Sequence, residues 1–398
     1  MAGCVLSLNA GSSSVKFGLH RLAAAAELPL ALARGQVRAE AGAWHLSANG
    51  SGETPDLDET LAAGPDDMAP ALARLVDWAQ IASGPEGLLA IGHRVVHGGA
   101  EFADPVILTP DRIAAIEALT KLAPLHQPRC LAPIRTLAAI RPKLRQTASF
   151  DTAFHRTLTG PASRYGLPRA LEAEGIRRYG FHGLSYDYIA QRLEALEPGS
   201  RGLRTVIAHL GNGASLCALK DGRSVDTTMG FSVLDGLLMG TRPGALDPGI
   251  LVYLLREHGY GADELEDILY RRSGLLGVSG RSSDMRDLLA DDSVAAKDAV
   301  ALFVLRAAQQ IAVMATSLEG LDRLVFTGGI GEHQPLVRVA ICRRLAFLGL
   351  SFNLAANDAG AMRISAEGSR IDVLVVPTDE EAVIARDAAA VCRDAGNK

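Results

Sequence analysis

The chain has 398 residues, of which 48% are hydrophobic and 21% charged, and its formal net charge is −5. This length exceeds that of one ordinary core and predicts two domains of a globular protein. Without an excess of basic residues, the chain is not expected to bind nucleic acid or an acidic membrane surface. We find no apolar run of spanning length and no charged leader before a hydrophobic stretch, which argues against a membrane protein.

The cysteines are scattered along the chain and odd in number: Cys4, Cys130, Cys217, Cys342 and Cys392. No two of them have CxxC spacing. This usage predicts reduced thiols in the cytoplasm and argues against a disulfide framework or a zinc site.

The first predicted element is a β-hairpin at residues 5–19, VLSLNAGSSSVKFGL, where apolar and polar residues alternate on both sides of a small polar turn. Small residues and a cation favour a phosphate, but a P-loop would continue from its glycine turn into a helix. Strand alternation predicts that Ser12, Ser14 and Lys16 lie on one side of the hairpin and Val15 on the core side. The sequence therefore predicts a phosphate-binding hairpin.

Strands and helices alternate in the middle of the chain. Residues 88–99 are predicted to form a buried strand that ends in a glycine turn, and residues 111–142 form helices broken by prolines. Residues 146–155 form a strand that carries Asp151 at its carboxyl end. Residues 206–219, VIAHLGNGASLCAL, then repeat the layout of the first hairpin about 200 residues later, which suggests a duplicated fold.

The last third continues the alternation. Residues 299–318 form an almost entirely apolar helix, predicted to be buried between layers, and a strand at 324–326 leads into a turn at 327–332. Residues 371–393 are a final strand and helix, with Glu380 in the helix's first turn. This order predicts an α/β protein with mixed or parallel sheets, whose ligands lie at the carboxyl ends of strands.

Nine short motifs occur in order along essentially the whole chain: NAGSSSVK (9–16), GHRVVHGG (92–99), FDTAFH (150–155), RYGFHGLS (178–185), HLGNGAS (209–215), DTTMGF (226–231), MGTRPG (239–244), SGRSSDMRD (279–287) and FTGGIGE (326–332). Together they resemble the motif series of the acetate kinase family. The resemblance implies duplicated actin-like (ribonuclease H-like) domains with a cleft between them, and a homodimer. It also implies Mg²⁺-dependent, reversible, in-line phosphoryl transfer between ATP and a short-chain carboxylate, in which Mn²⁺ could replace Mg²⁺.

The expected domains follow the duplication. We place the N-terminal domain, with the first hairpin, at residues 1–151 plus roughly 380–398. We place a C-terminal nucleotide-binding and dimerisation domain at residues 152–379.

The residue types agree with this chemistry. A carboxylate acceptor has a pKa near ~4, so at neutral pH it is already a nucleophile and needs no strong base. The enzyme must instead offset the repulsion between two anions, which favours cations in the site. Arg94, Arg242 and Arg286 lie beside glycine or in polar turns, and arginine donates in pairs to oxyanions. Any one of them could equally form a surface ion pair.

The resemblance assigns roles to these arginines and to their neighbours. Arg94 and Arg242 would clamp the acyl carboxylate and the transferring phosphoryl group, and His182 would donate to the equatorial oxygens, so that His182 and Arg242 stabilise the transition state. Asn212 is assigned to catalysis and to the second phosphate cradle. The predicted nucleotide-binding residues are Ser12, Ser14, Lys16, His209, Leu210, Gly211, Asn212, Gly213, Asp284, Met285, Arg286, Gly329, Ile330, Gly331 and His333.

Carboxylates at two predicted element ends suggest a metal site. Asp151 and Glu380 fit Mg²⁺, which takes one or two carboxylates plus phosphate oxygens. We predict Asn9 and Glu380 as metal ligands, and Asp151 for the metal and for catalysis. An Asx turn at Asp151 and helix capping at Glu380 are the alternatives, and the adjacent Glu381 leaves the register open.

Several positions depart from the family pattern. Arg94, Val96, Leu125 and Val233 are expected to line the acyl site, and Val233 stands where proline is usual, so propionate or a broader set of short-chain acids is an alternative to acetate. His333 stands in place of asparagine, which leaves nucleotide preference open. Tyr186 replaces a usual histidine, and Gln127 and Cys130 replace asparagines. A sugar kinase and a non-catalytic nucleotide-binding protein are the alternatives from other classes.

Overall fold

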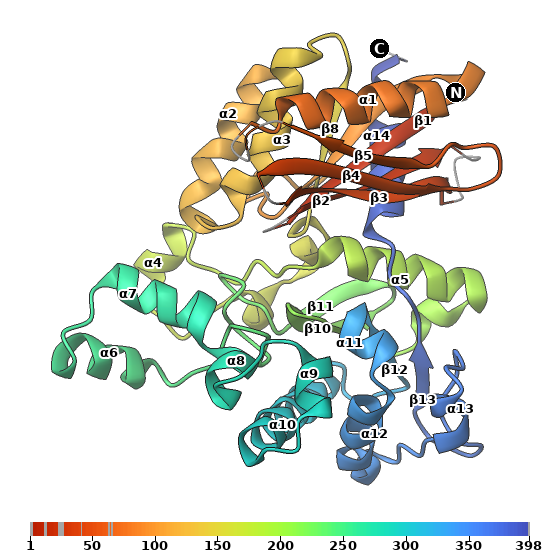
Figure 1. Cartoon of the computed structure of the whole chain (residues 1–398). Helices are drawn as coiled ribbons and strands as arrows, with labels where there is room; N and C mark the ends of the chain where they lie inside the picture. The colour runs from red at the N-terminus through yellow and green to blue at the C-terminus, as the bar shows by residue number, and fades with distance from the viewer. Residues whose placement is uncertain are drawn as a thin grey trace. The chain divides into compact units, whose positions relative to one another are not determined.

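The computed structural model describes residues 3–11, 14–22, 28–40, 42–62, 64 and 67–396. By its internal contacts the chain divides into two compact units. Unit 1 consists of Met1–Phe154 and Asp379–Lys398, and unit 2 of His155–Thr378 (Figure 1).

Unit 1 is built on an eight-stranded sheet with the order β5-β4-β3-β2-β1-β6-β8-β7. Strands β1 to β5 pair antiparallel, β6 and β8 continue parallel to β1, and β7 pairs antiparallel with β8. The strands are β1 (Cys4–Ala10), β2 (Ser14–Arg21), β3 (Leu30–Glu40), β4 (Ala43–Gly50), β5 (Leu57–Leu61), β6 (Leu88–Val95), β7 (Val106–Ile107) and β8 (Gln146–Phe150).

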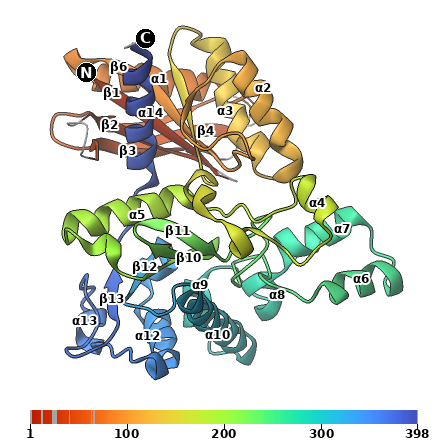
Figure 2. The same ribbon diagram turned by 180° about the vertical axis from the view of Figure 1, so that it is seen from behind.

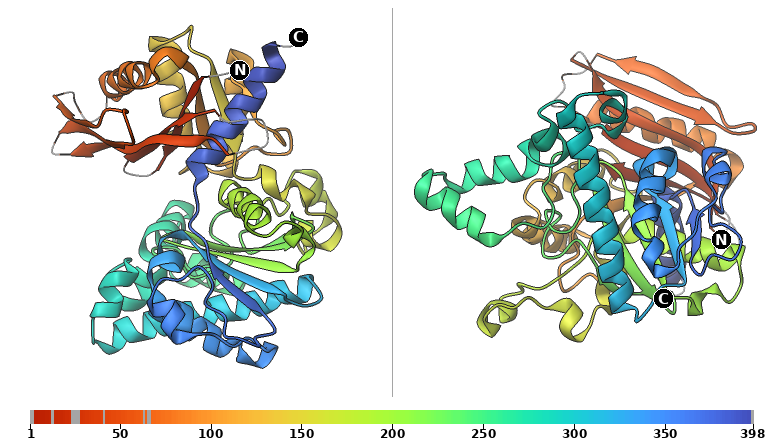
Figure 3. Two further views of the ribbon diagram at one scale, coloured as in Figure 1. Left: turned by 90° about the vertical axis from the view of Figure 1, so that its right-hand side faces the viewer. Right: turned by 90° about the horizontal axis from the view of Figure 1, so that it is seen from below.

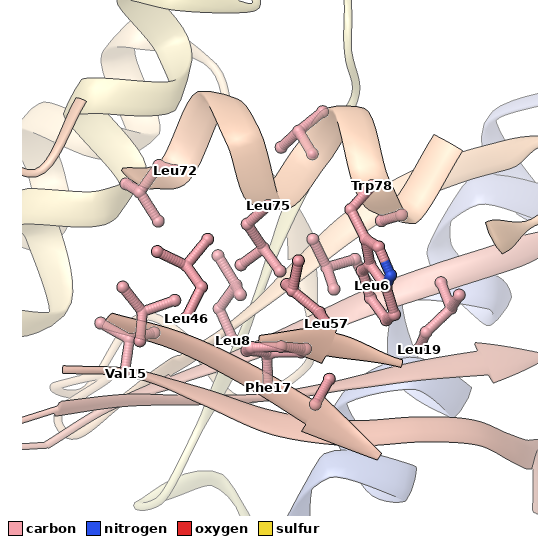
Figure 4. Packing of buried hydrophobic residues seen from close by; sticks show 14 of the residues in the cluster. Leu6, Leu8, Val15, Phe17, Leu19, Leu46, Leu57, Leu72, Leu75 and Trp78 are labelled. Carbon is pink, nitrogen blue, oxygen red and sulfur yellow. The ribbon is translucent and has the colours of Figure 1, made fainter. Parts of the chain in front are cut away.

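Both faces of this sheet are covered. Successive side chains of β1 point to opposite faces and therefore join different cores. Leu6 and Leu8 join the large core under α1 (Ala69–Ala82), which Figure 4 shows from close by with Phe17 and Trp78. Val5, between them, packs instead against α14 (Glu380–Gly396), which crosses the opposite face in Figure 2. Helices α2 (Pro110–Ala118) and α3 (Gln127–Ile140) complete the unit.

Unit 2 has a five-stranded sheet with the order β11-β10-β9-β12-β13. Its strands are β9 (Thr205–Leu210), β10 (Ala214–Lys220), β11 (Arg223–Thr227), β12 (Arg323–Thr327) and β13 (Asp372–Val375). Its helices are α4 (Arg169–Ala173), α5 (Gly183–Leu196), α6 (Pro248–Glu257), α7 (Ala262–Asp267), α8 (Gly274–Ser279), α9 (Met285–Ala290), α10 (Val294–Ser317), α11 (Gly328–His333), α12 (Pro335–Arg344) and α13 (Leu354–Asp358).

The two sheets share one topology. In unit 1, β3-β2-β1 are antiparallel and β6 and β8 follow in parallel; in unit 2, β11-β10-β9 are antiparallel and β12 and β13 follow in parallel. The predicted hairpins are β1–β2 and β9–β10, the same two positions in each sheet. The predicted duplicated α/β fold is therefore confirmed.

Two predictions for the last third were wrong. Residues 327–332 are not a turn, because α11 begins at Gly328, whose N–H donates to the Glu332 carboxylate one turn later. The apolar helix, α10, lies between layers as predicted, with the strands β9, β10 and β11 and the helices α8, α9 and α12 packed against it, although Val313 is 48% exposed. By length and composition alone α10 could cross a membrane, contrary to our expectation, although a core helix of a folded protein passes the same test.

Candidate active site

In unit 1, polar side chains gather where parallel strands end. Arg94 lies near the end of β6, Asp151 directly follows β8, and Asn9 lies near the end of β1. The carboxyl ends of neighbouring parallel strands meet at one edge of a sheet, which brings these residues together although they are far apart in sequence. The first turn of α14 adds Glu380 and Glu381 to the same edge.

Arg94 is the centre of this cluster. Its Nε and Nη2 donate to the two carboxylate oxygens of Asp151 at 2.9 and 2.5 Å, and its Nη1 donates to Asn9 Oδ1 at 3.1 Å. Burial lowers the pKa of Arg94, but the charges of Asp151 and Glu380 outweigh burial and raise it. Arg94 is thus a fixed, permanently charged guanidinium.

Asp151 forms a contact with Arg94 that the sequence analysis did not predict. It is 1% exposed, and both of its oxygens accept from Arg94. This bidentate pair orients the Arg94 plane, so the described contacts make Asp151 a positioning residue for Arg94. Its direct metal contact remains a prediction.

Glu380 and Glu381 place two carboxylates close together at Asn9. Asn9 Nδ2 donates to Glu380 at 3.0 Å and to Glu381 at 3.3 Å. Burial raises the pKa of each glutamate, and for Glu381 the charge of Glu380 raises it further. A divalent cation would relieve this repulsion, so the residues fit the predicted metal.

The described residues alone do not enclose a metal. Among the described residues there is no group of three or more His, Cys, Asp or Glu placed to hold an ion. Asn9 Oδ1 already accepts from Arg94, so a bond from Asn9 to a metal would require a change in that contact. A site with one or two protein carboxylates, completed by water and phosphate oxygens, is the Mg²⁺ pattern.

The first hairpin has the predicted facing. Val15 is buried at 3% exposure, and Lys16 is exposed opposite Asn9 in the β1–β2 pair. Ser14 is half-buried, and Ser12 lies outside the described residues. The alternation is confirmed for the described positions.

Two predicted acyl residues of unit 1, Val96 and Leu125, follow β6 in the chain. Val96 is 4% exposed, and Leu125 is half-buried just before α3. Gln127, which sequence reasoning treated only as a departure, holds this region together. Its side chain accepts from the His97 N–H at 3.2 Å and donates to the His97 carbonyl at 2.9 Å.

In unit 2, His182 and Arg242 meet at Gly213. A Cβ built on Gly213 would lie 2.8 Å from Arg242 Nη2 and 3.3 Å from His182 Nε2, so only glycine leaves both side chains their places. Arg242 Nη1 donates to the Val233 carbonyl at 2.9 Å, and Val233 is 8% exposed. Sequence reasoning grouped Arg242, His182 and Val233, and the structure brings the three together.

Arg242 differs electrostatically from Arg94. Burial lowers its pKa to about 10. Among the residues that the structure describes, Arg242 forms no salt bridge, whereas Asp151 neutralises Arg94. A half-buried cation without a described counterion suits an anionic ligand.

A buried hydroxyl network supports the two histidines. The His182 and His209 rings stack with centroids 4.4 Å apart. Ser215 lies 2.8 Å from His182 Nδ1, and Ser185 lies 2.8 Å from His209 Nδ1. Sequence reasoning missed both serines. Each lay within a quoted motif, but the placement of α5 beside the β9–β10 hairpin was needed to pair Ser185 with His209 and Ser215 with His182.

The glycine turns of unit 2 lie close together. The Gly211 N–H donates to the Gly213 carbonyl, which closes the β9–β10 turn, and Asn212 at its tip is exposed. A Cβ on Gly211 would lie 4.0 Å from the Gly329 nitrogen. The predicted nucleotide residues Leu210, Met285 and Ile330 have buried side chains, so contacts with a nucleotide would have to use their backbone.

Two of the predicted nucleotide residues, Arg286 and His333, have exposed side chains. Arg286 is 78% exposed and bonds the Asp284 carboxylate through Nε and Nη2, and these hydrogen bonds lower the pKa of Asp284. His333 is 75% exposed, 3.9 Å from Glu332. Glu332 was missed: it accepts from the backbone N–H groups of Gly328 and Thr378 and so ties α11 to the segment after β13.

Known proteins resemble this chain over its whole length. The model of the Acetokinase family matches residues 4–386. An acetate kinase of Rhodopseudomonas palustris (strain TIE-1) is 47% identical over 395 residues, which cover 97% of this chain and 98% of that protein. A solved propionate kinase from Francisella tularensis subsp. tularensis SCHU S4 has a TM-score of 0.88 at 35% identity, covering 96% of this chain and 98% of that one. The Porphyromonas gingivalis acetate kinase structure has a TM-score of 0.85 at 36% identity, covering 98% and 99%.

Proposed function

The chain belongs to the acetokinase family, and we propose that it catalyses reversible phosphoryl transfer between ATP and acetate, giving ADP and acetyl phosphate. The observation that carries the proposal is Arg242, a half-buried guanidinium without a described counterion beside His182. This is a site prepared for an anion rather than for a neutral hydroxyl. A sugar kinase would instead need an aspartate base facing its acceptor.

The proposed reaction is a direct displacement. An acetate oxygen attacks the γ-phosphorus, the bond from that phosphorus to the β–γ bridging oxygen breaks, and ADP leaves with the electron pair. Because the acetate is already ionised, no proton has to be removed. The protein's work is to position two anions and to stabilise charge on the transferring group.

The residues of the two units would share this work. Arg94, fixed by Asp151, would bind the acyl carboxylate or the phosphoryl group through N–H groups not used in that pair. Arg242 and His182 Nε2 would donate to the equatorial oxygens from either side of Gly213. The backbone of the two glycine turns and Asn212 would bind the ATP phosphates.

We propose Mg²⁺ as the metal, with Mn²⁺ able to replace it. Glu380 would hold it together with Asn9, and water and phosphate oxygens would complete its shell. When bound, the ion would neutralise phosphate charge. The exposed Lys16, whose charge lowers the pKa of Glu380, would contact a phosphate from the same edge of unit 1.

A substrate panel tests the proposed function. Purified protein is incubated with ATP, Mg²⁺ and, separately, acetate, propionate, butyrate or glucose, and ADP is measured. Acyl phosphate is trapped separately with hydroxylamine. We expect ADP and acyl hydroxamate with acetate, and weaker turnover as the acid lengthens. Phosphorylation of glucose but of no carboxylate would overturn the proposal.

The choice between acetate and propionate depends on Val233. Its side chain is buried and its carbonyl binds Arg242, so it would border the methyl end of an acid held by that arginine. One methylene in an apolar pocket changes binding by about 1–3 kcal/mol. We propose acetate as the preferred acid and propionate as the alternative.

Val233→Pro should change the ratio of kcat/KM for acetate and propionate by up to about tenfold, since it reshapes an apolar wall. Val233→Ala is the companion variant, and it should raise the relative activity with propionate because it leaves more room. Both ratios are measured by steady-state kinetics. Two unchanged ratios would remove Val233 from the acyl pocket.

We further propose a cytoplasmic homodimer with α6 in its interface. No residue of α6 is buried, and its apolar side chains Ile250, Val252, Tyr253 and Leu255 are 45–57% exposed. Figure 3 shows α6 and α7 extending away from the rest of unit 2. An exposed apolar face of this kind marks an association surface, and a second copy is the partner that the family resemblance implies.

Val252→Glu should shift the protein from dimer to monomer, because it places a charge in an apolar contact. Size-exclusion chromatography with light scattering measures the mass. Ile81→Glu is the matched control, since Ile81 is 73% exposed on α1 of the other unit and should leave the mass unchanged. A dimeric Val252→Glu protein would place the interface elsewhere, and a monomeric wild type would contradict the dimer itself.

A further inference from the structure

We propose that Tyr186 is a positioning residue for catalysis: through Ser215 it fixes His182 as the tautomer that carries its proton on Nε2. This inference rests on the proposed role of His182 in the reaction. It assigns a function to a side chain that differs from the histidine usual in the family at this position.

Three side chains form the chain of hydrogen bonds. His182 is the N-cap of α5, with a left-handed φ of 57°, and Tyr186 lies one turn later on the same helix. Both reach Ser215 on β10: its Oγ lies 2.8 Å from His182 Nδ1 and forms a short hydrogen bond with the Tyr186 hydroxyl. Tyr186 and Ser215 are fully buried, so water does not compete for these bonds.

Proton counting gives the direction of the bonds. Ser215 has one proton to donate and lone pairs to accept with. Burial raises the pKa of Tyr186 well above its usual value, so the phenol stays protonated, and we assign it as the donor in its hydrogen bond with Ser215. The Ser215 proton is then directed at His182 Nδ1, which accepts. An imidazole that accepts at Nδ1 carries its own proton on Nε2.

This tautomer has the proton where the chemistry needs it. His182 Nε2 and Arg242 Nη2 lie around Gly213, so an oxyanion there would receive an N–H from each. With the opposite tautomer, Nε2 would turn a lone pair toward the phosphoryl oxygens and repel them. A histidine at position 186 could gain a charge within the physiological pH range, whereas a buried phenol cannot.

The imidazole nitrogen shifts of His182 test the inference directly. The full chain is labelled with ¹⁵N-histidine, and the His182 signals are assigned by their loss in His182→Asn. In the wild type we expect a protonated-type signal at Nε2 and an unprotonated, acceptor-type signal at Nδ1. In Tyr186→Phe we expect protonation at Nδ1 to appear. A wild type protonated at Nδ1, or unchanged shifts in Tyr186→Phe, would overturn the inference.

Two further variants separate this effect from damage to the fold. Ser215→Ala removes the connecting hydroxyl and should change the His182 signals as Tyr186→Phe does, which provides a second test if one variant fails to fold. Tyr179→Phe is the matched control: it removes another buried phenol of unit 2, one that donates to the Gly175 carbonyl, and should leave the His182 signals unchanged.

Kinetics distinguish the inference from the function on which it rests. Tyr186→Phe should lower kcat about tenfold, less than loss of a direct donor, with KM for ATP little changed. A changed tautomer with unchanged kcat would support the Tyr186–Ser215–His182 connection and contradict the proposed role of His182. Reduced kcat with unchanged shifts would contradict the connection and leave the proposed function standing.

Discussion

Arg242→Ala should lower kcat by about 10²- to 10³-fold while leaving the melting temperature unchanged or higher. The rate falls because a charged donor that faces the transferring group is lost. Stability does not fall, because Arg242 is a half-buried cation without a described counterion, and the one described hydrogen bond of its guanidinium is to the Val233 carbonyl. A charge that is uncompensated in the free protein lowers its stability, and it is expected where the charge binds a ligand.

Steady-state kinetics with acetate and thermal unfolding measure the two effects together. Arg242→Lys keeps a positive charge but loses the planar fork, so it should recover only a small part of kcat. Arg306→Ala is the matched control, since this exposed arginine of α10 bonds Gln309 and should change neither quantity. Near-normal turnover in Arg242→Ala would show that the anion site is misassigned.

The sequence predicted the parts of the fold that depend on local pattern. Both hairpins were visible because apolar residues alternate on each side of a polar turn, and their matching layout predicted the duplicated sheets. The arginines, His182 and Asn212 were assigned to the site through motif order, and their roles remain predictions. Glycine at position 213 marked the turn, and the structure shows why it is glycine: His182 and Arg242 occupy the space that a Cβ would need.

What the sequence could not show depends on side chains that meet across the fold. The glycine pair at 328–329 indicates a turn, but Glu332 binds the Gly328 N–H and makes the segment helical. The contact between Asp151 and Arg94 could not be predicted, because nothing local reveals that β8 lies beside β6. Ser215 and Tyr186 are 29 residues apart, and only the packing of β10 against α5 pairs them.

The same reasoning predicts a different outcome for the second arginine. Arg94→Ala should lower kcat as strongly as Arg242→Ala, and it should also destabilise unit 1. The Asp151 carboxylate is 1% exposed and both its oxygens accept from Arg94, so the variant would leave a buried charge unpaired. Breaking a buried pair from one side costs about 3–5 kcal/mol.

A double variant separates the two roles of Arg94. Arg94→Ala combined with Asp151→Ala removes the unpaired charge, so it should regain much of the lost unfolding free energy without regaining activity. Urea unfolding and steady-state kinetics measure the two quantities. If Arg94→Ala had the same free energy of unfolding as the wild type, the buried pair would not stabilise the fold. Because Arg94 is neutralised and Arg242 is not, only Arg94→Ala should lose stability, while both variants lose rate to a similar extent. A general loss of folding cannot produce this contrast.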